Sequence, residues 1–242
     1  MLLMKNGNLA DLSSIDVAIL CGGQGSRLKP VLSDRPKVLA RVGARTFLDI
    51  LLRSLLPFGF VRVVLCVGYL GEQVKTYVRE QCYSNVVFSD ELQPLGTGGA
   101  LRNALPLLSD PFLAMNGDSV CDVDFASFLD FHLAREALLT IVVCSGSTLG
   151  GKAGNISLDD NGRVTSFVEG GPVGSGVSAG IYLMQQDIFD YAPDRVSFSL
   201  ERDLFPSAVG SRRCFGFSVS GTVFDIGDPV RYERACQLFK EE

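Results

Sequence analysis

The sequence lacks several features that would point to a metal-sulfur or disulfide-bonded protein. Tryptophan is absent, histidine occurs once, at His132, and no two of the seven cysteines form a C-x-x-C pair. A single histidine argues against a zinc site built from His and Cys. The cysteine number is odd and most cysteines lie inside apolar runs, such as residues 19–21 and 65–67. This usage is typical of small buried side chains in a reducing compartment.

Long runs of one kind are also missing. No block of five or six basic residues occurs and the formal net charge is −5, so we expect no nucleic-acid partner. No apolar run approaches the roughly 18–20 residues of a membrane span. Residues 1–14 do not follow the pattern of a signal peptide, because a polar stretch at residues 5–8 interrupts the apolar start. We therefore predict a cytoplasmic protein with no membrane partner.

Short apolar runs alternate with helix-like segments along the first part of the chain. This alternation predicts an α/β fold with a Rossmann-like, mostly parallel or mixed sheet flanked by helices. The expected strands are residues 16–21, 61–67, 85–89, 111–115 and 140–144, and the expected helices are residues 46–58, 71–81, 98–108 and 125–137.

The pattern changes after about residue 145. Strands are predicted at residues 155–158, 164–168 and 177–184, joined by turn signals such as residues 160–162. We expect this part to be a small antiparallel sub-region grafted onto the sheet. Strands at 215–220 and 223–226 and a helix at 229–240 follow, and residues 1–242 form a single domain.

A glycine-rich loop directly follows the first predicted strand. It comprises Leu20, Gly22, Gly23, Gly25 and Ser26, and it ends at Arg27. Glycines let the backbone approach a phosphate, and a guanidinium suits phosphate oxygens. Two familiar phosphate-binding patterns fail, because Gly-Lys-Ser/Thr is missing and because leucine occupies position 28, where a dinucleotide fingerprint needs glycine. Taken alone, the loop is also compatible with a plain structural turn.

Two further segments could contact a nucleotide. Pro36 fixes the backbone before Lys37, which could neutralise a phosphate or be an ordinary surface lysine. The turn at Gly96, Thr97 and Gly98 opens a helix and could lie against the flat face of a base. The alternative interpretation of this second segment is a simple helix-start turn.

Two aspartates lie at the ends of predicted strands. Asp118 follows Asn116 and Gly117, and Asp225 ends a later apolar stretch. Ligands in open α/β sheets bind beyond the carboxyl ends of strands. Mg²⁺ usually takes one or two carboxylates together with phosphate oxygens, so both aspartates are candidate magnesium ligands. The spacing in the sequence does not show whether they meet.

In combination, these segments resemble the sugar-1-phosphate nucleotidyltransferase family. The matching stretches are residues 22–28, 36–37, 96–100, 117–118, 178–182 and 225–229, in the family's order and spread over residues 16–236. The resemblance implies an enzyme in which an oxygen of a sugar 1-phosphate attacks the α-phosphorus of a nucleoside triphosphate. Pyrophosphate leaves, and no covalent enzyme intermediate is expected.

The resemblance also assigns roles to individual residues. Arg27, Lys37 and Asp118 would be catalytic, and Asp118 and Asp225 would bind the Mg²⁺ cofactor. The nucleotide would contact Leu20, Gly22, Gly23, Gly25, Ser26, Gly96, Thr97 and Gly98. The sugar would contact Asn116, Gly154, Glu169, Ser178, Ala179 and Gly180. Residues of about 16–145 would thus form the nucleotide-binding part and residues of about 146–242 the sugar-binding part with the closing strand and helix.

Within the family, the chain is similar to the short bacterial D-glycero-α-D-manno-heptose 1-phosphate guanylyltransferases. The similarity lies in residues 31–37, 68–70, 94–101 and 116–125, and it implies GTP and the heptose 1-phosphate as substrates. The chain departs from many relatives in two places. Gly170 stands where they have a lysine after Glu169, so Lys152 or an arginine would have to hold the sugar phosphate, and Ser178 replaces an asparagine.

Three alternatives remain open at this stage. A uridylyl- or thymidylyltransferase acting on a hexose or amino-sugar 1-phosphate would use the same chemistry. A non-catalytic regulator that binds nucleotide-sugars would share the fold, but Arg27, Lys37 and both aspartates are present. A dehydrogenase is the weakest alternative, since the dinucleotide fingerprint fails. The sequence leaves open whether the chain forms a homo-oligomer.

Overall fold

The structure is a computed structural model, and it describes residues 11–28, 31–32, 34–144, 154–170 and 176–239. Within these residues, a nine-stranded mixed sheet has the order β10-β9-β11-β6-β1-β4-β5; β8 also pairs with β11, and β12 pairs with β8. The strands are β1 Asp16–Leu20, β4 Arg62–Val67, β5 Val86–Asp90, β6 Phe112–Asn116, β8 Leu139–Cys144, β9 Gly154–Leu158, β10 Val164–Glu169, β11 Gly176–Met184 and β12 Cys214–Val219.

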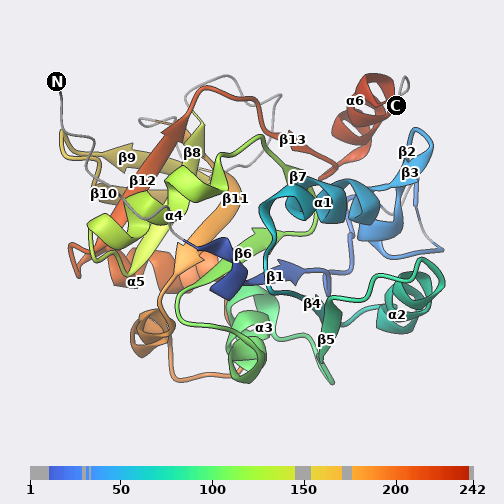
Figure 1. The fold of residues 1–242 in the computed structure, drawn as a ribbon, viewed down its shortest axis with the longest axis horizontal. Helices are drawn as coiled ribbons and strands as arrows, with labels where there is room; N and C mark the ends of the chain where they lie inside the picture. The colour runs from blue at the N-terminus through green and yellow to red at the C-terminus, as the bar shows by residue number, and fades with distance from the viewer. Residues whose placement is uncertain (1–10, 29–30, 33, 145–153, 171–175, 240–242) are drawn as a thin grey trace, which may run out of the picture.

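The sheet has a parallel half and an antiparallel half. Strands β6, β1, β4 and β5 pair in parallel, whereas β11 runs antiparallel to β6, β8 and β9. Strands β9 and β10 form an antiparallel pair at the edge (Figure 1). The predicted α/β fold with an antiparallel sub-region is therefore confirmed.

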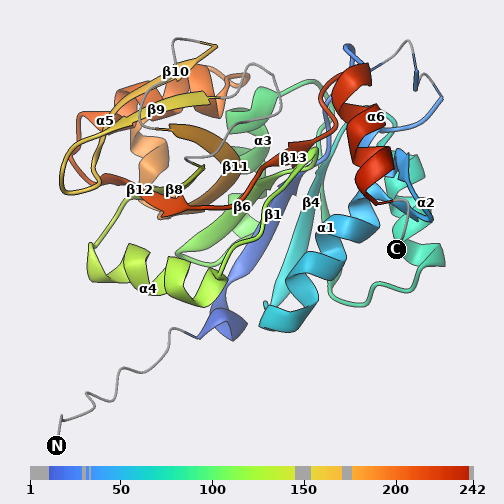
Figure 2. The same ribbon diagram turned by 90° about the horizontal axis from the view of Figure 1, so that it is seen from above.

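Helices cover both faces of the sheet (Figure 2). Their bounds are α1 Phe47–Leu55, α2 Gly71–Glu80, α3 Gly96–Ala104, α4 Phe125–Ala134, α5 Phe205–Val209 and α6 Pro229–Leu238. Side chains from α1, α2 and α4 pack into one buried cluster, and side chains from α3 and α5 pack into the other. Two layers of helices thus enclose the sheet.

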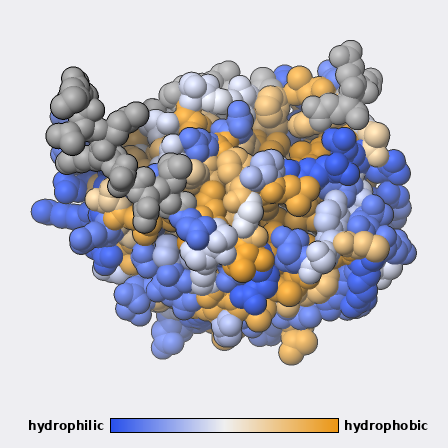
Figure 3. Space-filling model, viewed as in Figure 1, coloured by the Kyte–Doolittle hydropathy of each residue, from blue (hydrophilic) through white to orange (hydrophobic). Residues whose placement is uncertain are grey.

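The two clusters follow from the alternation of side chains along a strand. In β1, Val17 and Ile19 join the cluster under α1, whereas Ala18 between them joins the cluster under α3. Successive strand residues point to opposite faces, so a strand buried on both sides reads as a continuous apolar run. Figure 3 shows hydrophobic residues toward the middle of one face and hydrophilic ones along its rim, and the large apolar residues that remain exposed are spread over many segments of the chain, from Val31 to Leu238. Such scattered exposure is ordinary for a folded chain.

The order of the strands creates a crevice between β1 and β6. From β1 the chain continues to β4 on one side, and later it returns to β6 on the other side. Ligands in such sheets bind at this switch point, beyond the carboxyl ends of the strands. The register pairs Leu20 with Asn116, so the glycine-rich loop and the Asn116–Asp118 segment leave the sheet side by side.

Several short elements were not predicted from the sequence. They include the hairpin of β2 Arg41–Val42 and β3 Arg45–Thr46, the paired strand β7 Ser119–Val120, and the π-helical turn η6 Leu200–Leu204 together with the short helix α5 that follows it. Strand β7 pairs with β13 Phe224–Asp225, which lies within the strand predicted at residues 223–226. Two-residue strands carry too little periodicity to be detected, and the π-turn lies in a stretch without an apolar pattern.

His132 lies on α4 with its side chain buried in the core, and its imidazole Nδ1 lies 2.8 Å from the Thr140 Oγ1. Burial, assisted by the charge of Arg213, lowers the pKa of His132 to about 4. In the unfolded chain the imidazole would titrate near 6.5. The unfolded state therefore takes up a proton first as the pH falls, and stability is lost between about pH 6.5 and 4.

We expect this loss to reach about 3 kcal/mol between pH 7 and 4, because each pKa unit is worth about 1.4 kcal/mol. Urea unfolding of the wild type and His132→Asn at several pH values measures it. The variant should be less stable at pH 7, and its disadvantage should shrink as the pH falls. A disadvantage that stays constant over this range would contradict the assignment.

Candidate active site

The glycine-rich loop leaves β1 beside Glu91. A Cβ atom at Gly22 would overlap the Glu91 carboxylate, so only glycine fits this position without a shift. Gly25 has a φ of +56°, which glycine adopts without strain. The loop brings the exposed side chain of Arg27 to the rim of a cavity at the switch point.

Glu91 is a member of this site that the sequence did not reveal. Its Oε2 accepts a hydrogen bond of 3.1 Å from the backbone amide of Leu95. Burial raises the pKa of Glu91 against the effect of this bond. The carboxylate thereby connects the glycine-rich loop to the turn that begins α3.

The turn at the start of α3 is built against the 197–201 segment. Gly96 has a φ of +71°, and a Cβ atom there would lie 2.5 Å from the Phe198 carbonyl oxygen. The amide of Gly98 donates a 2.9 Å hydrogen bond to the same oxygen, and the Phe198 ring occupies the space of a side chain at position 98. Gly96 lines the cavity, whereas Gly98 is buried behind it.

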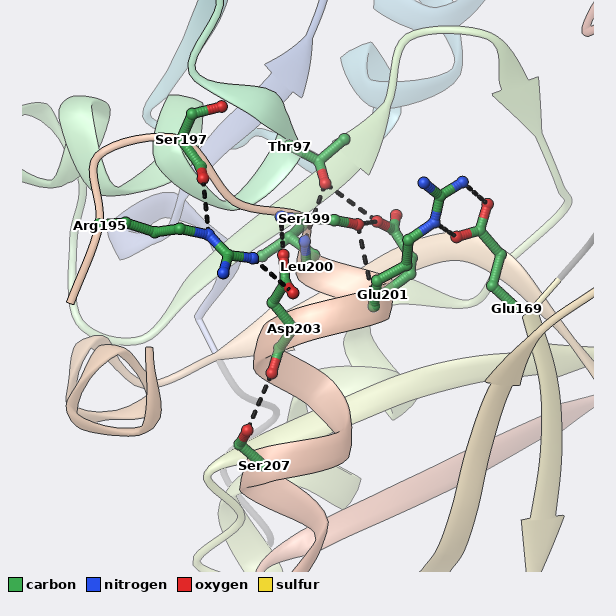
Figure 4. Close-up of polar contacts among 10 residues, drawn as sticks. Thr97, Glu169, Arg195, Ser197, Ser199, Leu200, Glu201, Asp203 and Ser207 are labelled. Carbon is green, nitrogen blue, oxygen red and sulfur yellow. Dashed lines mark hydrogen bonds and ion pairs between the residues drawn. The ribbon is translucent and has the colours of Figure 1, made fainter. Parts of the chain in front are cut away.

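Thr97 links this turn to η6 through a small hydrogen-bond network (Figure 4). Its hydroxyl accepts from the amide of Leu200 and donates to Glu201 Oε2, both at 2.9 Å. The Ser199 hydroxyl also donates to Glu201 Oε2 at 2.9 Å. Burial raises the pKa of Glu201, and the two hydroxyl bonds oppose that rise only in part. Thr97 therefore fixes the position of the turn, and its hydroxyl already donates one hydrogen bond and accepts another within the protein.

Asp118 lies next to Lys37 at the end of β6. The Lys37 Nζ is 2.5 Å from Asp118 Oδ2, and the Ser119 hydroxyl donates to Asp118 Oδ1 at 3.0 Å. Burial alone would raise the pKa of Asp118, but the charge and hydrogen bond of Lys37 hold it below its ordinary value. The carboxylate is thus ionised at neutral pH and the ammonium is held beside it.

The fold also brings Asp225 to Asp118, which the sequence could not show. Strand β13 pairs with β7 so that Asp225 faces Ser119, and the amide of Ile226 donates a 3.0 Å hydrogen bond to the Asp118 carbonyl. The Asp225 Oδ2 lies 2.7 Å from the Arg231 Nη1, and Arg231 also contacts Asp228 at 2.9 Å. Arg231 was not predicted, and it is 11% exposed.

The donor atoms here suit a magnesium ion. Asp118 and Asp225 line one cavity together with Asn116, whose buried Oδ1 has no hydrogen-bond partner in the described part of the chain. Within the same residues, no group of three or more His, Cys, Asp or Glu side chains forms a metal cluster. Mg²⁺ needs fewer, because it commonly takes one or two carboxylates and completes its shell with phosphate oxygens and water.

The predicted sugar-contacting residues line a second cavity, except for one. Gly154, Glu169, Ser178 and Gly180 face it, whereas Ala179 is buried in the core. Gly180 has a φ of +73°, and a Cβ atom there would lie 2.8 Å from the Asn116 amide nitrogen. Glycine thus lets β11 pass close to Asn116.

The shorter side chain of Ser178 still makes hydrogen bonds. Its Oγ accepts from the Gly180 amide at 3.1 Å and donates to the Tyr182 hydroxyl at 3.3 Å. Lys152, one of the cations that could replace the missing lysine, lies outside the described residues.

The two cavities adjoin at the switch point. The nucleotide-side cavity measures about 590 Å³ and the other about 360 Å³. Both are lined by Arg27, Thr97, Asn116, Asp118 and Gly227. The first is also lined by Leu20, Gly22, Gly23, Gly25, Ser26 and Lys37, which were predicted to be the nucleotide-contacting loop and a catalytic lysine. Two ligands could therefore meet at Asp118 and Arg27.

A glycine-rich loop, a lysine–aspartate pair and a second aspartate lie together at the switch point of a mixed sheet, so this is an α/β protein with a cavity whose shape and charges suit a nucleotide and with a second cavity beside it. Comparison with known proteins identifies the family to which the chain belongs. The nucleotidyl transferase family profile matches residues 17–238, and the chain belongs to this family. The family predicted from the sequence motifs is thereby confirmed.

Curated relatives that are similar to this chain include guanylyltransferases named for two different sugars. The chain is 31% identical to the mannose-1-phosphate guanylyltransferase catalytic subunit beta of Drosophila melanogaster over 96% of its length, and it spans 65% of that enzyme. It is 30% identical to the D-glycero-alpha-D-manno-heptose 1-phosphate guanylyltransferase of Aneurinibacillus thermoaerophilus, with 91% of the chain and 96% of the relative covered. The family thus includes guanylyltransferases for two related sugars.

Solved structures agree with the fold. HddC from Yersinia pseudotuberculosis superposes with a TM-score of 0.81 at 31% identity, covering 93% of this chain and all of the other. A second structure of the same protein, complexed with GMP-PN, superposes with a TM-score of 0.80 at 32% identity and covers the same shares. No helix in the described part of the chain is long and apolar enough to cross a membrane.

Proposed function

We propose that this chain is a sugar-1-phosphate guanylyltransferase, which converts GTP and a sugar 1-phosphate to a GDP-sugar and pyrophosphate. The observation that carries the proposal is the meeting of two cavities at Asp118 and Arg27. One cavity is walled by the glycine-rich loop and the other by polar side chains suited to sugar hydroxyls. This is the arrangement needed for one bound phosphate to attack another.

The reaction depends on position and charge rather than on covalent catalysis by the protein. An oxygen of the sugar phosphate forms a bond to the α-phosphorus of GTP, the bond to the bridging α–β oxygen breaks, and pyrophosphate leaves with the electron pair. Arg27 would stabilise the charge that develops on the phosphates. Lys37, held by Pro36 and by Asp118, would neutralise phosphate oxygens between the two substrates.

Asp118 and Asp225 would hold a Mg²⁺ cofactor. When bound, the ion supplies positive charge at the α-phosphate and makes the phosphorus more open to attack. Lys37 lowers the pKa of Asp118 and keeps it ionised, and the contacts with Lys37 and Arg231 orient the two carboxylates. The protein's own contribution is therefore a pair of carboxylates held in fixed positions by neighbouring cations, one of them, Asp118, at the junction between the cavities.

The sugar substrate is proposed to have the manno configuration. D-glycero-α-D-manno-heptose 1-phosphate is the first candidate, because the chain and the bacterial heptose guanylyltransferase match over almost the whole length of both. Mannose 1-phosphate is the second candidate, because the Drosophila relative is named for it. We expect Glu169 to accept hydrogen bonds from sugar hydroxyls in either case. We place the enzyme in the cytoplasm, and an assembly of several copies is compatible with this function.

A substrate panel tests the proposal. Pyrophosphate release is measured with Mg²⁺ while GTP, UTP, dTTP, CTP and ATP are crossed with heptose, mannose, glucose and N-acetylated amino-sugar 1-phosphates. We expect rapid release with GTP and a manno-configured sugar 1-phosphate. Release with UTP or dTTP alone would overturn the choice of base, and binding of nucleotide-sugars without any turnover would favour a regulatory protein.

A further inference from the structure

The wall of the sugar-side cavity contains a cation that the motifs did not identify. Arg202 lies on η6, and its side chain is 71% exposed. Its Nε and Nη2 contact the two carboxylate oxygens of Glu169 at 2.5 and 3.2 Å. Figure 4 draws these contacts as dashed lines at the labelled Glu169. The pair therefore joins η6 to the end of β10 across one side of this cavity.

The backbone that carries Arg202 is held on both sides. Glu201 before it accepts hydrogen bonds from Thr97 and Ser199, and Asp203 after it accepts a 2.8 Å bond from the Ser199 amide. Arg195 contacts the other oxygen of Asp203 at 2.7 Å. Because the side chains of Glu201 and Asp203 are both fixed by these contacts, the backbone at Arg202 is held in one position, from which its guanidinium reaches the cavity.

The charged side chains around this cavity indicate which cation is available to bind an anionic ligand. Its carboxylates are Asp118, Glu169, Glu201 and Asp225, and its cations are Arg27, Arg202 and Arg231. Arg231 is held between Asp225 and Asp228 and is only 11% exposed. Arg27 lies at the junction and faces the nucleotide-side cavity as well. Among the described residues that line this cavity, Arg202 is therefore the cation left for a second anionic ligand.

We propose that Arg202 binds the phosphate group of the sugar 1-phosphate while it retains its contact with Glu169. The inference rests on the function proposed above. Among the described residues, no hydrogen bond engages the Nη1 of Arg202, so its N–H groups are available to phosphate oxygens. A guanidinium has five donors in one plane, which lets it contact a carboxylate on one edge and a phosphate on another.

The contact with Glu169 gives the pair a joint function. By orienting the carboxylate, Arg202 fixes the group that accepts hydrogen bonds from the sugar hydroxyls. In return, Glu169 keeps the guanidinium on the cavity side of η6. One sugar 1-phosphate would thus be bound at its anionic end by Arg202 and at its hydroxyls by Glu169.

Steady-state kinetics of Arg202→Gln and Arg202→Lys test the inference, with Arg135→Gln as the control, because Arg135 is exposed at the C-terminal end of α4 and lines neither cavity. A charge-assisted hydrogen bond contributes about 1.5–3 kcal/mol, so Arg202→Gln should raise the KM for the sugar 1-phosphate about 10- to 100-fold. The KM for GTP should change less than about twofold. Lysine should restore part of the affinity, and the control should resemble the wild type.

The pattern across sugars separates a phosphate contact from a hydroxyl contact. If Arg202 binds the phosphate, Arg202→Gln should raise the KM by the same factor for mannose and heptose 1-phosphates. Factors that differ strongly between the two sugars, or an unchanged KM, would overturn the inference. If the wild type transfers no nucleotide, the proposed function fails, and calorimetric titration with mannose 1-phosphate then decides on Arg202. Equal affinity of wild type and Arg202→Gln, or no binding by the wild type, would overturn it.

Discussion

Replacing Asp118 with asparagine is expected to lower kcat by roughly a thousandfold while leaving the protein folded. Asparagine has nearly the same shape and can still accept the Ser119 hydroxyl bond. It carries no charge, so a carboxylate ligand for the cation at the α-phosphate is lost. Removal of one electrostatic group from a catalytic site typically costs about 10²–10³ in rate, and loss of a metal ligand adds to this.

The matched control for this prediction is Asp124→Asn. Asp124 lies on the same segment but caps α4 by accepting a hydrogen bond from the Ser127 amide at 3.1 Å. Asparagine caps helices as well as aspartate does, so this variant should keep wild-type turnover within about twofold. Pyrophosphate release and a thermal unfolding curve are measured for both variants. Near-normal turnover in a folded Asp118→Asn protein would remove Asp118 from the mechanism.

Lys37→Met is expected to lower kcat/KM by roughly a hundredfold or more, because the substrate phosphates lose a fixed positive charge. Methionine fills much of the space of the lysine stem, so the packing around the site should persist. The side chain of Lys37 is only 14% exposed and it is the neighbour that holds the pKa of Asp118 down. In the variant, burial would dominate and the pKa of Asp118 should rise.

This change has a consequence that a purely structural lysine would not produce. The acidic limb of the pH–rate profile should move to higher pH in Lys37→Met, because Asp118 must be ionised to act. Lys75→Met provides the control, since Lys75 on α2 pairs with Glu72 of the same helix and with Asp90 of β5 and lines neither cavity. A Lys37→Met enzyme with wild-type kcat/KM would show that the ion pair with Asp118 serves only the fold.

The sequence predicted the part of the site that lies on segments directly following the parallel strands β1 and β6. The glycine-rich loop follows β1 and the Asn116–Asp118 segment follows β6, so the general geometry of parallel sheets places them together. It could not predict that Asp225 reaches Asp118, because that contact depends on the pairing of two-residue strands, β7 and β13. Such short pairings leave no periodic pattern in the sequence.

The site residues that the sequence did not predict were missed for one shared reason. Glu91, Glu201, Arg202 and Arg231 are charged residues outside any recognised motif, and only the fold brings them to the cavities. Conversely, Gly98 and Ala179 belong to matching motifs but lie behind the cavity walls, where Phe198 and the core cover them. A motif marks a segment, whereas the alternation of side chains along that segment decides which members face the ligand.

The central claim is direct attack of a sugar 1-phosphate on the α-phosphorus of GTP within one site. GTP labelled with ³²P in the α-position, incubated with Mg²⁺ and the preferred sugar 1-phosphate, tests it in a single reaction. We predict that the label appears in the GDP-sugar, that one pyrophosphate forms per labelled product, and that the protein stays unlabelled. Label that becomes covalently attached to the protein, or GTP that remains intact with every sugar 1-phosphate, would contradict the claim.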